Sequence, residues 1–450
     1  MPVRPASFGG TIPPYHIENV ISMSSASPYG IGTACIQPGY TPKVGESRIL
    51  PIVQSTTFKY DDIEQVHRIM TLQEFGFKYT RTGNPTVAGF EQKINFLEGG
   101  VGAVATASGQ SANVLAISNL VRSGDHIVSA TTIYGGTYSL FNTTLPKWGV
   151  ATTFVDPEWS YKRLAKAFRP NTKALFVETI GNPGLNIPDF DKFTALAKEF
   201  DVPFVVDNTL ATPFLFQPFK HGANVITHSA TKYIDGHATS IGGVVIDGGN
   251  YNWDNDKFPE FTEPDPSYNG VSYTKKFGKQ AYLFKARAQY LRDFGACLAP
   301  MNAFLFNLGL ETLHLRMPRH SANALALAKS LAANSEVSWV NYPGLDPKGR
   351  RRIKKYFERP EGSGILTFGL KGDYERIGRF FKNLKIAALV IHIGDARTGV
   401  LHPATSTHAQ LSPDEQLAAG IPPDLIRVSV GIEDAADLIK DFDQAIKSSS

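Results

Sequence analysis

The stretch Thr227-His228-Ser229-Ala230-Thr231-Lys232-Tyr233 directly follows the apolar residues Val225 and Ile226. Upstream, a second apolar stretch, Pro203-Phe204-Val205-Val206, ends on Asp207-Asn208-Thr209. Short apolar runs of this kind predict buried strands, and the polar residues then lie at the strand ends. In open α/β sheets, ligands bind outside the carboxyl ends of the strands. We therefore expect an amine and a carboxylate to face one crevice.

The residue types at these two strand ends indicate a particular chemistry. Lys232 can form an imine with an aldehyde, while the hydroxyls of Ser229 and Thr231 can hydrogen-bond a phosphate. Asp207 can hold a proton on a pyridine nitrogen. A lysine that forms a Schiff base, paired with an acid on the ring nitrogen, is typical of a site for pyridoxal phosphate (PLP). The sequence thus predicts PLP as a cofactor.

Apolar runs and amphipathic stretches alternate from about residue 100 to 245. The runs 101–105, 126–128 and 174–177 read as strands, and 111–120 and 191–200 read as helices. Strands separated by helices predict an α/β fold whose parallel sheet is buried on both faces. Each polar residue that follows a predicted strand could alone be a cap, a turn residue or a surface amine. Their coincidence favours one crevice, formed by Ser108, Tyr134, Asn182, Asp207, Ser229 and Lys232.

The texture of the chain changes after residue 247. Residues 248–279 are rich in aromatic side chains, Asp, Asn, Pro and Gly, which is typical of irregular chain. This segment could be a lid or cleft wall, or a linker packed on the surface. From about Phe294 the chain is helix-rich and then mixed, and 366–370 and 426–430 alternate like half-buried strands. We expect a second, smaller α/β domain there.

Length and composition bound the function. A chain of 450 residues exceeds one ordinary core, and 45 basic against 41 acidic residues predict neither a nucleic-acid nor a membrane partner. The run 348–355 is the one basic cluster; a solvated face is the favoured interpretation, and a patch for an anionic partner the alternative. The first thirty residues read as an extension, loose or docked on a neighbouring subunit.

The cysteines and histidines point away from disulfides and metals. Two cysteines, Cys35 and Cys297, form no disulfide framework, so a reducing, cytoplasmic location is expected. The eleven histidines show no HExxH spacing, and the cysteines show no CxxC pair. We predict no metal site.

Several motifs together resemble the Cys/Met-metabolism family of PLP enzymes, from about Thr33 to Asp434. They are Tyr79-Thr80-Arg81-Thr82-Gly83-Asn84-Pro85-Thr86, Ser108-Gly109-Gln110, Val206-Asp207-Asn208-Thr209 and Ser229-Ala230-Thr231-Lys232-Tyr233. The chain is most similar to the O-acetylhomoserine sulfhydrylase group, on the cues 32–37, 178–183, 235–239 and 266–268. The resemblance implies the aspartate-aminotransferase-like fold (PLP fold type I), with a mostly parallel seven-stranded sheet. It divides the chain into an arm toward a neighbouring subunit (1–75), a PLP-binding large domain (76–290, with the insertion 248–280) and a small domain (291–450).

The resemblance also implies roles for the crevice residues. Lys232 carries the cofactor and moves protons, Tyr134 stacks on the ring, Asn182 bonds the ring hydroxyl oxygen, and Asp207 bonds the ring nitrogen. Arg427 clamps the substrate carboxylate, because a planar guanidinium suits two parallel hydrogen bonds. The cofactor phosphate is held by Ser108, Gly109, Gln110, Ser229 and Thr231.

Tyr79 and Arg81 match family residues that reach the phosphate of the adjacent subunit, and Tyr79 also borders the substrate. Each complete site then needs two chains, and the implied assembly is a tetramer built as a dimer of dimers. One departure is His392, where relatives usually carry Asn near the substrate carboxylate. This position leaves the carboxylate contacts open.

The implied reaction is γ-replacement. O-acetyl-L-homoserine reacts with sulfide, or with methanethiol, to give L-homocysteine, or methionine, and acetate. A methionine γ-lyase is one alternative, although those enzymes carry Cys in place of Gly136. A cystathionine γ-synthase or O-succinylhomoserine sulfhydrylase is another. A non-catalytic scaffold would lack Lys232 or Asp207, and both are present.

Overall fold

The structure is a computed structural model that describes residues 29–450, apart from 408, 410–411 and 419. Most of the extension expected over the first thirty residues lies outside the described part. Two β-sheets organise the described chain. The larger has the strand order β1-β7-β6-β5-β4-β2-β3, and the smaller has the order β10-β11-β12-β9-β8.

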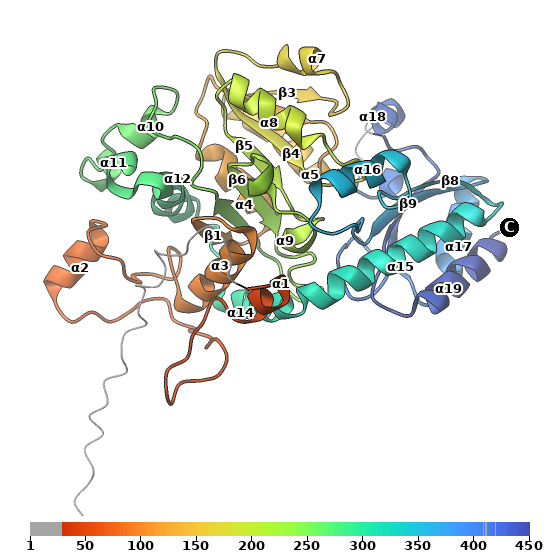
Figure 1. The fold of residues 1–450 in the computed structure, drawn as a ribbon, viewed down its shortest axis with the longest axis horizontal. Coiled ribbons are helices and arrows are strands. Elements are labelled where there is room, and N and C mark those ends of the chain that lie inside the picture. Colours follow the sequence, from red (N-terminus) through yellow and green to blue (C-terminus); the bar gives the residue numbers. More distant parts are fainter. Residues whose placement is uncertain (1–28, 408, 410–411, 419) are drawn as a thin grey trace, which may run out of the picture.

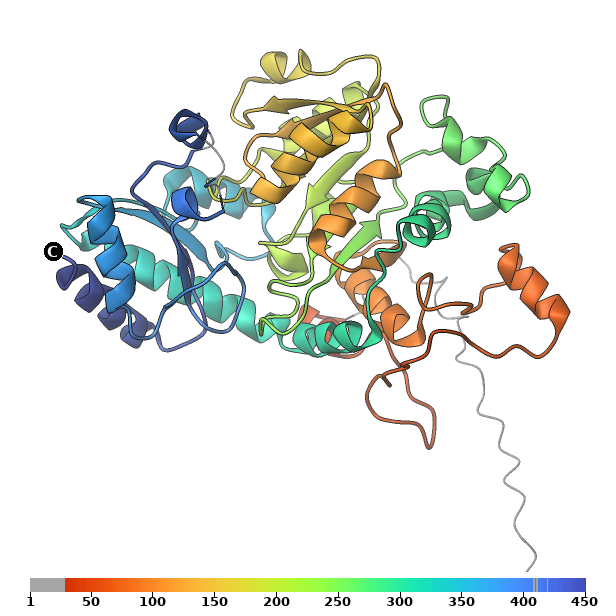
Figure 2. The same ribbon diagram turned by 180° about the vertical axis from the view of Figure 1, so that it is seen from behind.

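The larger sheet is mostly parallel, as predicted. The strands β6, β5, β4, β2 and β3 pair in parallel, whereas β7 pairs antiparallel with both β1 and β6. Helices α4 (Gly109–Ser118) and α8 (Phe190–Glu199) cover opposite faces of this sheet (Figures 1 and 2). Burial on both faces explains why the strands read as continuous apolar runs. Their bounds are β1 (Gly102–Thr106), β2 (His126–Ala130), β3 (Ala151–Val155), β4 (Thr172–Glu178), β5 (Phe204–Asp207), β6 (Val225–Ser229) and β7 (Gly243–Asp247).

The smaller sheet lies in the C-terminal part and includes both predicted strands there. Its members are β8 (Val337–Asn341), β9 (Ile365–Leu370), β10 (Ala388–Leu389), β11 (Gly399–Leu401) and β12 (Leu425–Ser429). The 21-residue helix α15 (Leu313–Ala333) runs from the region of the larger sheet to the smaller one (Figure 1). Helix α19 (Ala435–Lys447) packs beside α15, and helix α17 (Tyr374–Asn383) packs beside α19. Apolar side chains between these helices and the strands form a second core.

Several aromatic side chains of the segment 248–279 are buried. The segment forms the short helices α10 (Pro259–Thr262) and α11 (Tyr273–Phe277), and α12 (Ala281–Lys285) follows it. Trp253 stacks on Tyr282 with ring centroids 5.0 Å apart, and Trp253, Phe258 and Phe261 are buried. This favours the packed interpretation over a lid for the buried part of the segment.

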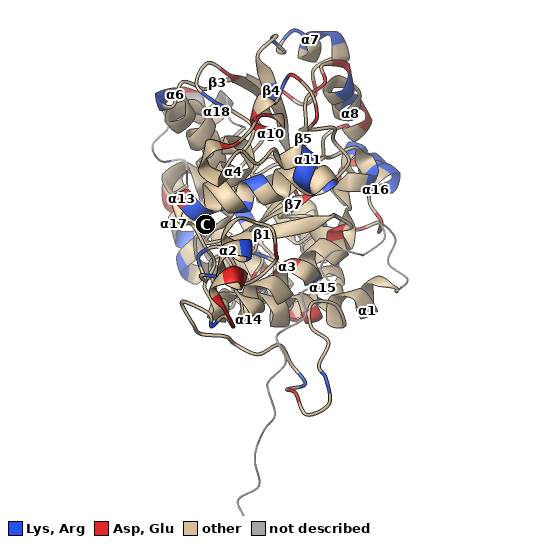
Figure 3. Ribbon diagram, turned by 90° about the vertical axis from the view of Figure 1, so that its left-hand side faces the viewer, with Lys and Arg blue, Asp and Glu red and all other residues tan. Residues whose placement is uncertain are grey.

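The basic run forms helix α16 (Pro347–Tyr356), and only part of it is a solvated face. Lys348 and Arg352 pair with Glu158, and Lys355 pairs with Asp191 at 2.5 Å. These acids belong to the segment around the larger sheet, so the helix joins the two halves of the chain. In Figure 3 much of the ribbon of α16 is blue, the colour of Lys and Arg. Among the described residues, no helix is both long and apolar enough to cross a bilayer.

Helix α14 (Pro300–Glu311) packs directly on the segment that follows Lys232. A Cβ added at Gly309 would lie 2.1 Å from the backbone oxygen of Ile234. We expect Gly309→Ala to lower the free energy of unfolding by about 1–3 kcal/mol. The added methyl group would clash with backbone atoms, which cannot move away as a flexible side chain can. Thermal and denaturant unfolding would measure the change.

The matched control is Gly378→Ala, in α17, where an added Cβ meets nothing within 4 Å. Alanine is favoured over glycine in a helix by up to about 1 kcal/mol, so this variant should be equally or more stable. Equal effects of the two substitutions would contradict the tight packing at Gly309.

Candidate active site

The carboxyl ends of β4, β5 and β6 lie together. Glu178 is the register partner of Asp207, and Asp207 is the partner of Thr227. Lys232 follows three residues after β6 ends at Ser229. Asp207 and Ser229 therefore lie at the carboxyl ends of two neighbouring strands, and the shared crevice with Lys232 stays a prediction.

Thr209 links two of these strand ends. Its hydroxyl donates to Oδ1 of Asp207 and accepts from the backbone N–H of Ser229 at 2.9 Å. The N–H of Thr209 also donates to Asp207, at 3.0 Å. Burial raises the pKa of Asp207, and the hydrogen bonds from Thr209 and the charge of His228 oppose that rise. Thr209 had no predicted role, although a Thr two residues after an Asp is a recognisable turn signal.

Helix α4 begins against the end of β6. Ser108 caps the helix by accepting from the N–H of Ser111 at 3.0 Å. A Cβ at Gly109 would lie 2.5 Å from the Cβ of Ser229, so only glycine permits this approach. The first amides of the helix, at Gly109 and Gln110, point out of the helix start, where anions bind well. Thr231 is nearby in sequence, and its hydroxyl bonds the backbone of Gly242 at 3.1 Å.

The substrate side of the crevice carries two cations. Burial, and then the charge of Arg427, lowers the pKa of Lys232 to about 8. Arg427 is buried on β12, its pKa is lowered by burial to about 10, and its Nη1 donates to Oδ1 of Asn182 at 3.3 Å. No carboxylate forms an ion pair with Arg427 among the described residues. A buried guanidinium with free donors is a binding site for an anion.

Tyr134 stands at the start of α5 (Gly135–Ser139) with its ring about half exposed. Its backbone N–H donates to Oε1 of Glu178 at 2.6 Å. A Cβ at Gly136 would lie 2.5 Å from the ring of Tyr134, so a side chain at that position would displace the ring. Glu178 was named only as part of a motif and had no predicted role. Its hydrogen bond with Tyr134 joins residues 44 positions apart in the chain, so the sequence does not reveal it.

His392 lies on the loop that closes over Lys232. The N–H of Gly394 donates to Oγ of Ser429 at 2.9 Å, and a Cβ at Gly394 would touch the backbone of Lys232 and Tyr233. Nε2 of His392 is enclosed and has no hydrogen-bond partner among the described residues. Burial, and then the charge of Lys232, lowers the pKa of His392, so its imidazole is neutral at pH 7.

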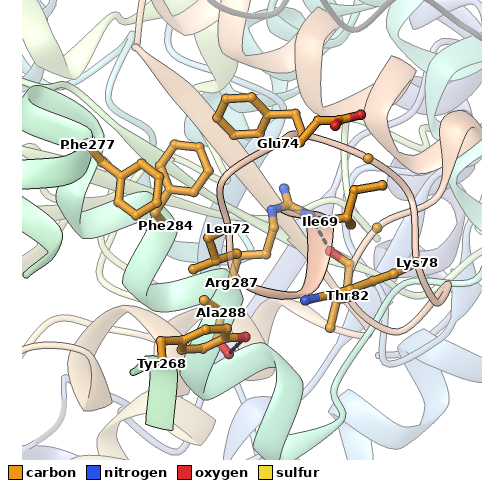
Figure 4. A pocket seen from close by; sticks show the side chains of 13 residues that line it. Ile69, Leu72, Glu74, Lys78, Thr82, Tyr268, Phe277, Phe284, Arg287 and Ala288 are labelled. Atoms are coloured by element: carbon orange, nitrogen blue, oxygen red, sulfur yellow. Dashed lines mark hydrogen bonds between the residues drawn. The ribbon is translucent and has the colours of Figure 1, made fainter. Parts of the chain in front are cut away.

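Tyr79 and Arg81 lie apart from this crevice. They line a surface hollow together with Lys78, Tyr268 and Arg292. The guanidinium of Arg81 lies 5.3 Å from the ring centre of Tyr79, which is 44% exposed. Beside it, an apolar pocket separates residues 69–83 from residues 268–288 (Figure 4). No described contact joins Tyr79 or Arg81 to Lys232 of the same chain.

The crevice fits pyridoxal phosphate. An amine, a buried acid, a capped helix start closed by glycine, and two hydroxyl residues beside it supply the donor set that the cofactor requires. Among the described residues, no group of three or more His, Cys, Asp or Glu could hold a metal ion.

The lowered pKa of Lys232 leads to a prediction about cofactor uptake. Only the free amine attacks an aldehyde, so uptake of pyridoxal phosphate by protein stripped of it should accelerate as pH rises, with a midpoint near 8. Arg427→Gln removes a charge that lowers this pKa, so the midpoint should move upward. Stopped-flow absorbance would record the rates. Arg397→Gln, an exposed arginine paired with Asp395, is the control and should leave the midpoint unchanged.

Comparisons with known proteins agree with this chemistry. The family model of Cys/Met metabolism PLP-dependent enzymes matches residues 32–447. An O-acetyl-L-homoserine sulfhydrylase of Leptospira meyeri is 45% identical over 89% of this chain and 93% of its own length. A homocysteine synthase of Schizosaccharomyces pombe is 46% identical over 89% of this chain and 94% of its own.

A solved structure adds the cofactor itself. A protein of Campylobacter jejuni, described as a putative O-acetylhomoserine (thiol)-lyase with N'-pyridoxyl-lysine-5'-monophosphate, superposes with a TM-score of 0.90 at 38% identity. The match covers 93% of this chain and all of that one. The shared fold is therefore the PLP-dependent α/β fold predicted from the sequence. The chain belongs to the Cys/Met metabolism PLP-dependent enzymes, and pyridoxal phosphate is its cofactor.

Proposed function

We propose that the chain catalyses γ-replacement on O-acetyl-L-homoserine, in which sulfide or methanethiol displaces acetate. L-homocysteine or methionine is the product. The observation that carries the proposal is the proximity of Lys232 to a buried Arg427 that has no acid partner among the described residues. The sulfhydrylase relatives, similar over most of the chain, support the choice of substrate.

Arg427 binds the carboxylate of the amino-acid substrate in this proposal. Its guanidinium is buried and held by Asn182, so substrate binding supplies the missing counter-charge. A second donor could come from the imidazole of His392, whose Nε2 has no partner in the described chain. Orientation by two fixed groups places the reacting carbons over the amine of Lys232.

Lys232 moves the protons. When bound, pyridoxal phosphate supplies an electron sink that stabilises negative charge at the substrate carbons. The amine of Lys232 takes the proton from Cα and returns it, and a pKa near 8 leaves a useful share of free base at neutral pH. Once the Cα proton has been passed on, the same amine accepts a second proton, from Cβ. Acetate then leaves Cγ with the electron pair of the broken C–O bond, and sulfide or methanethiol adds at Cγ as the protons are returned.

The other crevice residues hold the cofactor. Asp207 bonds the ring nitrogen, Asn182 the ring hydroxyl oxygen, and Tyr134 covers the ring face. The phosphate is held by the hydroxyls and helix-start amides of Ser108, Gly109, Gln110, Ser229 and Thr231. The capped start of α4 supports this assignment, since helix starts favour anions.

Product analysis tests the reaction. Holoenzyme supplied with O-acetyl-L-homoserine and sulfide should form homocysteine and acetate in equal amounts, and Lys232→Ala should lose at least about 10³-fold in kcat, the order of a lost acid–base group. Ammonia and 2-oxobutyrate as main products would favour the lyase. A preference for the succinyl ester, with sulfide or cysteine as acceptor, would favour O-succinylhomoserine sulfhydrylase or cystathionine γ-synthase.

We further infer that each site is completed by a second chain. Tyr79 and Arg81 lie in a hollow away from their own Lys232, and the hollow has no acid to pair with Arg81 among its described lining residues. In the proposed assembly they reach the phosphate of the neighbouring subunit, and Tyr79 borders its substrate. Residues 1–75 are the intersubunit arm, 76–290 the large domain and 291–450 the small domain. We propose a cytoplasmic tetramer, built as a dimer of dimers.

Subunit mixing tests the shared site. Lys232→Ala and Arg81→Ala homo-oligomers should both be nearly inactive. After dissociation and reassembly of an equal mixture, hybrids contain one site with neither substitution, and activity should return to roughly a quarter of wild type if each site draws on two chains. No recovery, with hybrids verified by mass spectrometry, would contradict the proposal.

A further inference from the structure

Glu178 is a buried carboxyl at the cofactor site that the proposed reaction does not use. It ends β4 and is the register partner of Asp207 on the neighbouring parallel strand. Parallel neighbours stand about 4.8 Å apart, and residues in register point to the same face. The two carboxyl groups are both buried, and they lie close enough for the charge of Asp207 to act on Glu178.

Two negative charges at this separation are unfavourable in a buried site, so one proton is expected to be shared between the pair. The hydrogen bonds decide where that proton resides. Asp207 accepts two from Thr209, through its N–H and its hydroxyl. Glu178 accepts a single one, from the N–H of Tyr134. No Lys, Arg or His forms an ion pair with Glu178 among the described residues. The charge is therefore better stabilised on Asp207.

We propose that Glu178 is a positioning residue that stays protonated in the working enzyme. One of its oxygens fixes the backbone of Tyr134, and the other carries the proton. Asp207 is then the single negative charge that faces the ring nitrogen. The inference rests on the pyridoxal phosphate site, and it holds whichever acyl ester is the substrate.

The electrostatics agree with this arrangement. Burial, and then the charge of Asp207, raises the pKa of Glu178 well above its ordinary value, while the hydrogen bond from Tyr134 opposes the rise. The charge of His228, on the adjacent strand, lowers the pKa of Asp207 and so favours the charged form of that carboxyl.

The geometry also gives Glu178 a mechanical role. Tyr134 starts α5, which has only five residues and no side-chain cap. The 2.6 Å hydrogen bond from its N–H to Glu178 therefore anchors the whole turn. Gln110 adds a second tie, because its Nε2 donates to the oxygen of Gly136 at 3.1 Å. The ring of Tyr134 is placed by these backbone contacts.

Three variants distinguish the two roles of Glu178, which are to carry a proton and to accept the hydrogen bond from the N–H of Tyr134. Glu178→Gln mimics a protonated carboxyl, with one acceptor for Tyr134 and one donor. Holoenzyme with this change should keep cofactor affinity and kcat/KM within about threefold. The pH of the cofactor absorbance transition should also stay unchanged. Glu178→Ala removes the acceptor and should weaken cofactor binding by roughly tenfold or more, the cost of an orphaned buried donor. Glu178→Asp is shorter, does not reach Tyr134, and should behave like the alanine variant.

Infrared difference spectroscopy reads the proton without turnover. Holoenzyme labelled with ¹³C-glutamate should show a protonated carboxyl band at pH 7.5 that Glu178→Gln removes and that the control Glu358→Gln, an exposed partner of Lys220, leaves intact. Two results would overturn the inference: a band untouched by Glu178→Gln, or a cofactor transition moved to lower pH by loss of a negative charge. A failure of the γ-replacement assay alone would leave both readouts intact, so the two proposals fail separately.

Discussion

The site depends on one constraint: three neighbouring parallel strands are held in one register. Glu178, Asp207 and Thr227 form one row across the sheet; Glu178 and Asp207 end β4 and β5, and β6 continues two residues further, to Ser229. Thr209 locks this row, since its hydroxyl bonds both Asp207 and the backbone of Ser229. Lys232 follows only three residues later. A shift of one strand by one residue would turn the acid to the opposite face, and the cofactor would lose the partner of its ring nitrogen.

Charge is divided across the crevice. The amine of Lys232 and the guanidinium of Arg427 form a cationic side. Burial is the main reason why the pKa of each group is lowered. The carboxyls of Asp207 and Glu178 form a second, acidic side, at the ends of β5 and β4. A substrate that brings one carboxylate matches the cationic side, while the protonated ring nitrogen matches a single negative charge. The proposed proton on Glu178 keeps the second side at that single charge.

Much of this arrangement was predictable from the sequence, for a physical reason. A strand buried on both faces must be a short apolar run, and in β5 the first polar residue, Asp207, marks the strand end. In β6 the polar residues Thr227, His228 and Ser229 still belong to the strand, so the apolar run alone ends it too early. Strand direction is different: Gly243–Asp247 has the same apolar texture as its parallel neighbours, yet β7 runs antiparallel. Contacts between residues far apart in the chain could not be predicted from the sequence either. The contact of Arg352 with Glu158 spans 194 residues, so the basic run read as solvated.

The arm shows what a single chain leaves unsatisfied. It exposes large apolar side chains at Ile49, Ile52, Ile63 and Phe75, and such surface is costly in water unless a partner covers it. Arg81 lies against the ring of Tyr79, and the described lining of its hollow contains no acid. A neighbouring cofactor phosphate would supply that missing negative charge, and the same contact would cover the apolar arm. The proposed assembly would therefore both neutralise the charge of Arg81 and cover the exposed apolar side chains. In such an assembly, cofactor binding and subunit association would stabilise each other.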